Sequence, residues 1–426
     1  MTESALLILF TLAVVAMIDY LPRLFVSSAK KTVKNLERRG KIPDFLIMPT
    51  VYGNISYLQN ISFLKKYADK VLICTSVHET PEFYSDLRKA CIKYGFRYAK
   101  AELPFANGKP IKNAYTIYAG IFKNQDKLRV PKDTPCVLID ADTYSEQNVN
   151  NLIRTFKQHK LDIASLRCEV AKPKTTIEIL QDFEYTLAMD NRRMDPWLTS
   201  GACNMAKASV FRHVFANHSR FFAGGDIEIG KLAQVMGYKI RHIPFVFYTA
   251  APDTFKQWFN QRIIWFAGGF RHHVVNLTSY SWHHFFMLFY NSLIIYLLLP
   301  LRWIELVNFP LTLLVLIGLS WVYLAILIHG KRRWRKEYLL LPFYSFLQSM
   351  IILPRGIMRY CKLAWTQRSL GMLRYDLKAK NVGTRILFKT LNISSAGMIL
   401  YVAITFTIAR LGYWLHNGYI MHFFAK

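Results

Sequence analysis

Two acidic residues separated by a single alanine, Asp140 and Asp142, follow the apolar run Cys136–Ile139. A short run of bulky apolar residues predicts a buried strand, so both carboxylates are expected at its carboxyl end. Carboxylate oxygens are preferred ligands of Mg²⁺ and Mn²⁺, and such a cation can in turn hold a diphosphate. The pair is therefore a candidate metal site, with an Asp-capped turn as the alternative interpretation.

A further acidic position, Asp226, stands before a helical pattern, Ile229–Met236, that ends at Gly237. The free N–H groups of a first helical turn favour a carboxylate, so a simple helix cap explains the residue. The functional alternative is a general base that takes the proton from an attacking hydroxyl group.

The segment Phe255–Arg271 carries aromatic residues at helical spacing together with Gln261, Arg262 and Trp265. Trp and Arg favour the membrane–water interface, so an interfacial helix explains the aromatic residues. It does not explain Gln261, and a binding role for this segment stays open.

Short apolar runs alternate with polar helical segments between Asp44 and Pro252, as in a sheet of parallel strands joined by helices. The clearest expected strands are Phe45–Met48, Val71–Cys74 and Cys136–Ile139. Ligands of open α/β sheets bind beyond the carboxyl ends of the strands, where polar residues follow these runs.

The composition is apolar and strongly basic at once: 52% of the 426 residues are hydrophobic, and there are 55 Lys and Arg against 27 Asp and Glu. The basic runs, Lys30–Lys41 and Lys331–Lys336, stand beside long apolar stretches, where the positive-inside rule places them. This distribution argues against nucleic acid as a partner. The six cysteines are scattered, without the spacing of a zinc site, and are expected to be reduced.

Several apolar stretches approach the length of about 20 residues that a membrane-spanning helix needs. The first, Ala5–Val26, predicts a spanning helix, because Glu3 precedes it and no small-residue cleavage site of a signal peptide follows. Near the C-terminus we expect a hairpin of two spanning helices, Phe285–Leu301 and Leu306–Ile328, and a last span, Ile393–Ala409. Between them we expect a re-entrant or interfacial segment, Tyr338–Leu353, and an amphipathic interfacial segment, Arg355–Lys389.

The chain is thus expected to have four parts: an N-terminal transmembrane helix (1–28), a cytosolic α/β domain (29–252), interfacial helices (253–282), and a C-terminal transmembrane and interfacial region (283–426). The expected location is the cell membrane, with multiple crossings and the α/β domain in the cytosol. Membrane lipids are therefore expected partners.

In this order, and after such a sheet, the motifs resemble those of the family-2 glycosyltransferases, above all the membrane-embedded processive synthases of the cellulose, chitin and hyaluronan type. The resemblance covers Asp44 to Arg271. It implies a GT-A-like nucleotide-sugar-binding domain, an α/β fold with a mixed, mostly parallel sheet, flanked by transmembrane and interfacial helices. It also implies a UDP-sugar donor and Mg²⁺ or Mn²⁺ as cofactor.

Carried over by position, the family's Asp-x-Asp motif implies that Asp140 and Asp142 bind the nucleotide and the metal. The family's Glu-Asp motif implies that Asp226 is the catalytic base. The Gln-x-x-Arg-Trp motif implies that Gln261 and Trp265 bind the acceptor.

The chain departs from the family pattern in three places. Gly225 replaces the glutamate before the base, and Ile264 replaces the arginine of the Gln-x-x-Arg-Trp motif, where Arg262 is near enough to supply the charge. The segment Met48–Gly53 resembles the family's Pro-x-Tyr-Asn-Glu only loosely, and Thr75-Ser76 stands where an Asp-Asp-Gly-like run is expected.

Weaker matches complete the candidate donor and acceptor sites. Thr50 and Tyr52 are implied to bind the nucleotide, and Lys109 to meet a phosphate as a point charge, against the alternative of a solvated turn. Ser200 and Gly201 lie in a segment similar to the family's small-residue acceptor segment, against the alternative of a tight turn before a helix.

The implied activity is inverting transfer of a sugar from a nucleotide sugar to a growing polysaccharide, which is secreted through the protein's own helices. A non-processive enzyme that glycosylates a lipid or a lipid-linked acceptor is the first alternative, and product size separates the two. A catalytically silent membrane scaffold with the same fold is the second, and donor turnover tests it.

Overall fold

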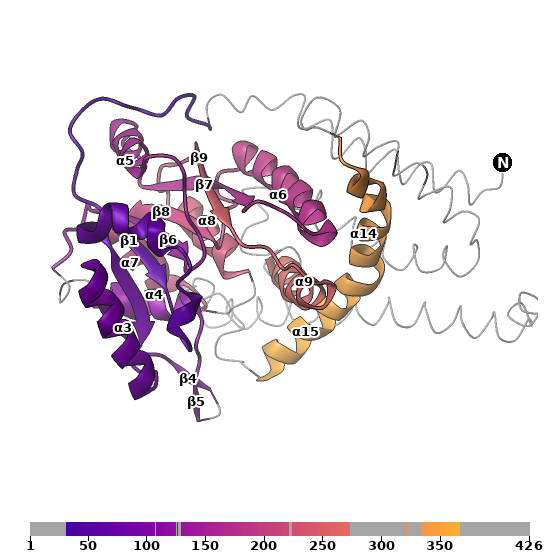
Figure 1. Ribbon diagram of the computed structural model, residues 1–426, viewed down its shortest axis with the longest axis horizontal. Helices are drawn as coiled ribbons and strands as arrows, with labels where there is room; N and C mark the ends of the chain where they lie inside the picture. The colour runs from indigo at the N-terminus through magenta and orange to yellow at the C-terminus, as the bar shows by residue number, and fades with distance from the viewer. Residues whose placement is uncertain are drawn as a thin grey trace, which may run out of the picture. The chain divides into compact units, whose positions relative to one another are not determined.

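The computed structural model describes residues 31–272, apart from 107, 125, 127–128 and 221–223, together with 318, 321 and 334–366 (Figure 1). The chain divides into two compact units. The first comprises Ser27–Trp258 and Leu363–Lys378, and the second comprises Met1–Val26, Phe259–Lys362 and Ala379–Lys426.

A seven-stranded sheet with the order β3-β2-β1-β6-β8-β7-β9 forms the centre of the first unit. Its strands are β1 (Leu46–Thr50), β2 (Leu72–Ser76), β3 (Arg97–Ala101), β6 (Pro135–Asp140), β7 (Ile163–Val170), β8 (Cys203–Lys207) and β9 (Ile240–Thr249). A separate two-stranded sheet pairs β4 (Phe105–Ala106) with β5 (Lys109–Pro110).

The sheet is mixed and mostly parallel, as the resemblance implies. Strands β1, β2, β3 and β6 run parallel, β8 runs antiparallel to both β6 and β7, and β7 and β9 are parallel. The three strands expected from apolar runs are confirmed as β1, β2 and β6, each with bounds that differ by one or two residues from the runs.

Helices cover both faces of this sheet, which is why its central strands are apolar on both sides. The helices are α2 (Ile61–Leu64), α3 (Pro81–Tyr94), α4 (Ala114–Lys123), α5 (Val149–Gln158), α6 (Thr176–Met194), α7 (Ala208–Asn217) and α8 (Gly225–Val235). Apolar residues of α3 and α5 pack on one face, and those of α4, α7 and α8 on the other (Figure 1). Two 3₁₀ turns follow β1, Ile55–Tyr57 and Lys65–Lys70.

Polar caps fix where these helices begin. The side chain of Thr80 accepts a hydrogen bond from the Phe83 N–H at the start of α3. Asn113 and Thr116 form a capping box at the start of α4. Such caps satisfy N–H groups that have no partner inside the helix, and they set the loops before both helices, which lie beside the candidate site.

The second unit contains α14 (Leu341–Leu347) and most of α9 (Phe255–Phe270) and α15 (Leu353–Thr366). The first residues of α9 and the last residues of α15 belong to the first unit. A 3₁₀ turn, Lys336–Leu340, precedes α14, and a π-helical turn, Gln348–Ile352, joins α14 to α15. The ring of Phe270 packs on that of Tyr360, with 5.6 Å between ring centroids. A Cβ at Gly356 would lie 2.7 Å from the Cβ of Phe266, so α9 and α15 approach closely at this glycine.

One helical run among the described residues, Lys336–Leu363, is long and apolar enough to cross a membrane, with a mean hydropathy of 1.2 over its best window. A buried helix of a water-soluble protein passes the same test. The expected spans at 1–28, 285–301, 306–328 and 393–409 lie outside the described residues, apart from 318 and 321.

Candidate active site at the carboxyl ends of the strands

Strands β1 and β6 lie side by side at the centre of the sheet, with β2 and β3 beyond β1 and with β8 beyond β6. Open α/β sheets bind ligands at the carboxyl end of such a switch in strand order. The register pairs Thr50, the last residue of β1, with Asp140, the last residue of β6. The fold therefore brings the Asp-x-Asp segment to the place where a ligand is expected.

Asp142 is held by hydroxyl groups on both sides. Its Oδ1 accepts hydrogen bonds from Thr143 Oγ1 and Thr249 Oγ1, each at 3.2 Å. Burial raises the pKa of Asp142, and these hydrogen bonds, with one from the backbone N–H of Ala250, act against the rise. The carboxylate is therefore fixed at the end of β9.

Asp140 lies among carboxylates. Burial, followed by the negative charges of Asp142 and Asp226, raises the pKa of Asp140 to about 8. The charges of Asp142 and Asp226 therefore act against ionisation of the Asp140 carboxyl group. Within the described residues no ion pair reaches any of the three.

A divalent cation fits Asp140 and Asp142 on these grounds. No group of three or more His, Cys, Asp or Glu suited to a metal occurs in the described part of the chain. Mg²⁺ is often bound by only one or two carboxylates plus the phosphates of a substrate, so a two-carboxylate site suits a cation that arrives with a diphosphate.

Asp226 occupies the first turn of α8, as a helix-capping residue would, but its carboxylate also faces Gly201. A Cβ added at Gly201 would lie 3.6 Å from Asp226 Oδ2 and 3.4 Å from the hydroxyl oxygen of Tyr115. Thr199 Oγ1 donates a 2.5 Å hydrogen bond to the carbonyl oxygen of Asp226. Ser200 is buried and Gly201 is exposed, so the predicted acceptor segment lies against the predicted base.

Burial raises the pKa of the Asp226 carboxyl group, and the positive charge of Arg192 lowers it, as do hydrogen bonds from the N–H groups of Ile227, Asp226 and Gly201. Burial is the largest of these effects, so the pKa of Asp226 lies above its ordinary value and the carboxylate accepts a proton more readily than one in water.

Packing explains why Gly225 stands where the resemblance implies a glutamate. A Cβ added at Gly225 would lie 2.6 Å from two ring carbons of Tyr115, so Tyr115 occupies the space of a side chain there. The Tyr115 ring stacks on His218 with 5.4 Å between centroids. His218 Nδ1 accepts from the Arg220 N–H, which leaves Nε2 to donate to the carbonyl oxygen of Gly225 at 2.8 Å.

Glu228 is fully buried one turn further along α8. It accepts hydrogen bonds from both the N–H and the hydroxyl of Ser219, each at 2.6 Å. Together with His218 it ties the segment before α8 to the helix itself. Tyr115 and His218 belong to no motif in the sequence, and they meet Glu228 only in the fold.

Arg192, at the end of α6, is a further residue that no motif marks. Its Nε is buried without a hydrogen-bond partner among the described residues, and its Nη1 lies 3.8 Å from Met189 Sδ. Its charge acts on Asp226 and on Cys203, which follows the predicted acceptor segment. The structure therefore places a cation beside the predicted base.

The remaining predicted donor residues lie on three different segments: β1, the loop after it, and β5. Thr50 is buried beside Asp140. Burial, and then the charges of Asp140 and Glu79, raise the pKa of Tyr52, whose side chain is half-buried. Lys109 is exposed on β5, and its predicted contact with phosphate remains a prediction.

The predicted acceptor residues of α9 belong to the second unit, and their roles remain predictions. Arg262 is fully buried, donates to Gln261 Oε1 at 2.6 Å and to the Tyr344 hydroxyl at 3.5 Å. Its guanidinium carbon lies 4.0 Å from the ring centroid of Trp265, which is 42% exposed. These contacts lie within its own unit, and the predicted role of Arg262 at the diphosphate remains a prediction.

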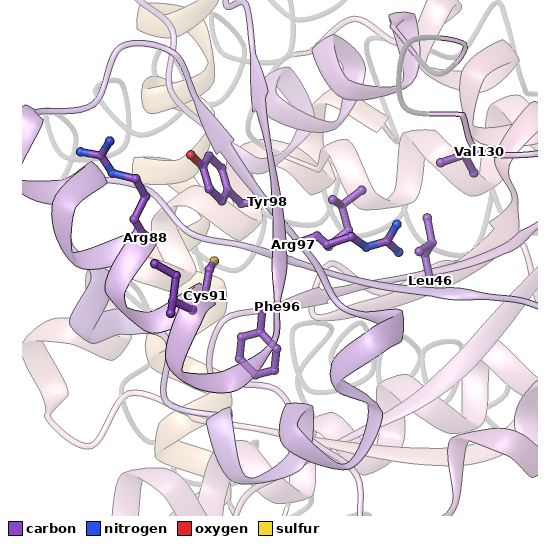
Figure 2. A pocket seen from close by; sticks show the side chains of 9 residues that line it. Leu46, Arg88, Cys91, Phe96, Arg97, Tyr98 and Val130 are labelled. Carbon is purple, nitrogen blue, oxygen red and sulfur yellow. The ribbon is translucent and has the colours of Figure 1, made fainter.

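A pocket of about 660 Å³ lies away from these residues (Figure 2). It contains Leu46 and Leu72, the first residues of β1 and β2, and is therefore at the opposite end of the parallel strands from Asp140. Arg88, Arg97 and Tyr98 give it a partly polar rim (Figure 2). It does not contain any predicted site residue.

Residues 136–329 match the family model for "Glycosyl transferase family group 2". Among solved structures, a putative glucose-1-phosphate thymidylyltransferase from Bacillus anthracis aligns with 51% of this chain and 93% of its own, at 12% identity and a TM-score of 0.31. A 4-diphosphocytidyl-2C-methyl-D-erythritol synthase aligns with 53% of this chain and 99% of its own, at 10% identity and a TM-score of 0.29. No curated protein matches the chain.

Proposed function

We propose that this chain, a glycosyltransferase with a family-2 domain, moves a sugar from a UDP-sugar to a hydroxyl group of a growing polysaccharide, with inversion at the anomeric carbon. The observation that carries the proposal is the arrangement of three carboxylates at the switch point of the sheet. Two of them, Asp140 and Asp142, share one strand end, while Asp226 lies apart on α8 beside Gly201.

The proposed step is a single displacement. The acceptor oxygen forms a bond to the anomeric carbon, the bond from that carbon to the diphosphate oxygen breaks, and its electron pair leaves with the diphosphate. Asp226 takes the proton of the attacking hydroxyl. Inversion follows because one displacement occurs and no enzyme–sugar bond forms.

The chain's own side chains prepare this step. Arg192 and the N–H of Gly201 act against the rise that burial causes in the pKa of Asp226. Thr249 and Thr143 hold Asp142 in place. A divalent cation bound by Asp140 and Asp142 would supply the positive charge that a departing diphosphate requires.

Membrane attachment and processivity are further parts of the proposal. The apolar run Lys336–Leu363 and the expected spans outside the described residues support attachment to a membrane. The exposed face of Trp265 offers a flat apolar surface for an acceptor sugar, which supports a polysaccharide as product. The family match favours an enzyme over a silent scaffold.

Turnover by the purified full chain in nanodiscs tests the proposal. A panel of UDP- and GDP-sugars with Mg²⁺ or Mn²⁺ is followed by release of nucleoside diphosphate, and the products are sized. Asp226→Asn is expected to reduce turnover by about 10²–10⁴-fold, the usual contribution of a general base. The matched control is Asp133→Asn, an exposed aspartate before β6, which should leave turnover unchanged.

Product size then separates the acceptors. High-mass polymer supports the polysaccharide synthase, and a single sugar on a lipid supports the non-processive alternative. An Asp226→Asn variant with undiminished turnover would remove Asp226 from the mechanism.

A further inference from the structure

A second polar cluster lies beyond Tyr52, at the end of β2. Glu79 precedes the first turn of α3, and its side chain is only 2% exposed. Its Oε2 accepts a hydrogen bond from the Gly53 N–H at 3.0 Å, and its Oε1 lies 3.1 Å from Lys112 Nζ. The carboxylate of Glu79 is thus held by one hydrogen bond and one ion pair.

Lys112 completes a connection among three loops. Its Nζ also donates to the carbonyl oxygen of His78 at 2.6 Å. Gly53 lies after β1, Glu79 after β2, and Lys112 directly before Asn113, the cap of α4. The Glu79–Lys112 ion pair and the hydrogen bond from Gly53 to Glu79 thus join the loops that follow β1 and β2 to the loop that begins α4. We call this the Glu79–Lys112 clamp.

The loop after β1 is fixed at its other end as well. Asn60 Nδ2 donates to the carbonyl oxygens of Asp140 at 3.2 Å and Thr143 at 2.6 Å. The N–H of Gln59 donates to the carbonyl oxygen of Ala141 at 2.9 Å. This loop therefore runs from the clamp to the Asp-x-Asp turn, anchored at both ends.

Tyr52 lies on this anchored loop, and the charges of Asp140 and Glu79 both raise its pKa, after burial. Its hydroxyl group is therefore near both carboxylates. The position of Tyr52 depends on the clamp on one side and on the Asp-x-Asp turn on the other.

The strand order assigns a direction to a bound donor. The predicted base and Gly201 lie on the β8 side of β6, so the sugar and the acceptor belong there. The diphosphate belongs at the switch point, with Asp140 and Asp142. The nucleoside must then extend the other way, across β1 toward β2, where the clamp lies.

We infer that the Glu79–Lys112 clamp positions the loop that receives the nucleoside half of the donor, and thereby sets donor affinity without acting on the reacting atoms. Glu79 and Lys112 are positioning residues in this account. The inference rests on the proposed function for the identity of the donor. Thr75 and Ser76 at the end of β2 are fully buried, which leaves Glu79 as the acidic side chain that follows this strand.

The test uses the full chain in nanodiscs and the variants Glu79→Gln, Lys112→Met and Lys112→Arg. Lys123→Met, an exposed lysine at the far end of α4, is the control. The two neutralising variants are expected to raise the donor KM about tenfold with kcat within about twofold, because they loosen binding that is equal in the ground and transition states. Lys112→Arg should restore most of the affinity, since it keeps the charge.

Fragments of the donor locate the effect. Inhibition by the nucleoside diphosphate of the active donor should weaken about as much as the donor KM, whereas inhibition by inorganic pyrophosphate should not change. If inhibition by the nucleoside diphosphate and inhibition by pyrophosphate weaken equally, the inference is overturned. A loss of kcat at unchanged donor KM would overturn it as well. The neutralising variants could also show a large fall in melting temperature together with a loss of both donor affinity and kcat. If Lys112→Arg does not restore these quantities, the inference is overturned, because the clamp then serves the fold alone.

The failure of the proposed function can be told apart. If the wild-type chain turns over no donor, calorimetric titration with UDP and with GDP still measures nucleotide binding. Weaker binding of the bound nucleotide by Lys112→Met than by Lys123→Met supports the clamp. Equal binding by the two variants, or no binding by the wild-type chain, contradicts it.

Discussion

Gly230 is expected to be essential for the rate of sugar transfer, although it has no side chain and lies one turn beyond Asp226. A Cβ added there would lie 1.9 Å from the carbonyl oxygen of Trp197 and 2.9 Å from Thr199 Oγ1. Real Cβ atoms essentially never come closer than 3.0 Å to such atoms. Gly230→Ala therefore forces α8 and the segment around Trp197 apart by about 1 Å, since a packed interior has no slack to absorb the methyl group.

This displacement reaches the site because both elements belong to it. Thr199 donates a hydrogen bond to the carbonyl oxygen of Asp226, and the segment that contains Trp197 and Thr199 continues into Ser200 and Gly201. Overpacking of this kind costs about 1–3 kcal/mol of unfolding free energy. For a domain of this size that corresponds to a fall in Tm of roughly 2–10 °C. A misplacement of about 1 Å at a reacting group can reduce the rate about 100-fold.

The assay compares Gly230→Ala with Gln234→Ala, a half-buried position on the same helix that tests for a general effect of alanine on α8. Diphosphate release at saturating donor gives kcat, and thermal unfolding gives Tm. We expect a loss of kcat near 100-fold in Gly230→Ala well below its unfolding temperature, and a near-normal rate in Gln234→Ala. A Gly230→Ala variant with normal kcat and Tm would refute the packing argument.

The other predictions concern charge. Replacing Arg192 with Gln removes the positive charge that lowers the pKa of Asp226, so the acid limb of the pH profile of kcat/KM should move to higher pH. The control variant Arg193→Gln, at an exposed neighbouring position, should leave the acid limb in place. An acid limb that does not move in Arg192→Gln would show that Arg192 does not act on Asp226. The pKa of Asp140 near 8 means that, without metal, its carboxyl group is mostly protonated below that pH. A cation binds the carboxylate and not the protonated carboxyl group. The Mn²⁺ concentration for half-maximal activity should therefore fall roughly tenfold for each pH unit up to about pH 8 and then level off. A Mn²⁺ concentration for half-maximal activity that stays constant over this pH range would contradict the assignment of Asp140 to the metal.

The local part of the fold follows from the sequence. Runs such as Val71–Cys74 and Cys136–Ile139 became buried parallel strands, because a strand covered on both faces needs apolar residues at every position. The position of Asp140 and Asp142 at a strand end follows from the same run. The sequence around Asp140 and Asp142 does not predict which distant segments pack against them, because local patterns depend only on neighbouring residues in the chain.

One departure from the family pattern, and the choice between two lysines, are explained only by the tertiary structure. Gly225 is a glycine because the ring of Tyr115, from α4, occupies the place of a side chain. Lys109 was the lysine that the motif marked, yet the ion pair with Glu79 belongs to Lys112, three residues later. A motif match assigns a role by position, whereas the turn of the backbone before α4 decides which lysine faces the neighbouring loop.

Local sequence patterns are enough to predict an α/β fold, the acidic strand end and the candidate base, because burial and helix or strand periodicity act over a few neighbouring residues. Only the packing of distant segments brings Asp226 against Gly201, brings the charge of Arg192 to Asp226, and joins three loops through Glu79 and Lys112. These contacts arise when α6, α8 and the loops at the carboxyl ends of the strands pack onto one sheet. Their physical origin is close packing between distant segments, which no local pattern of residues records.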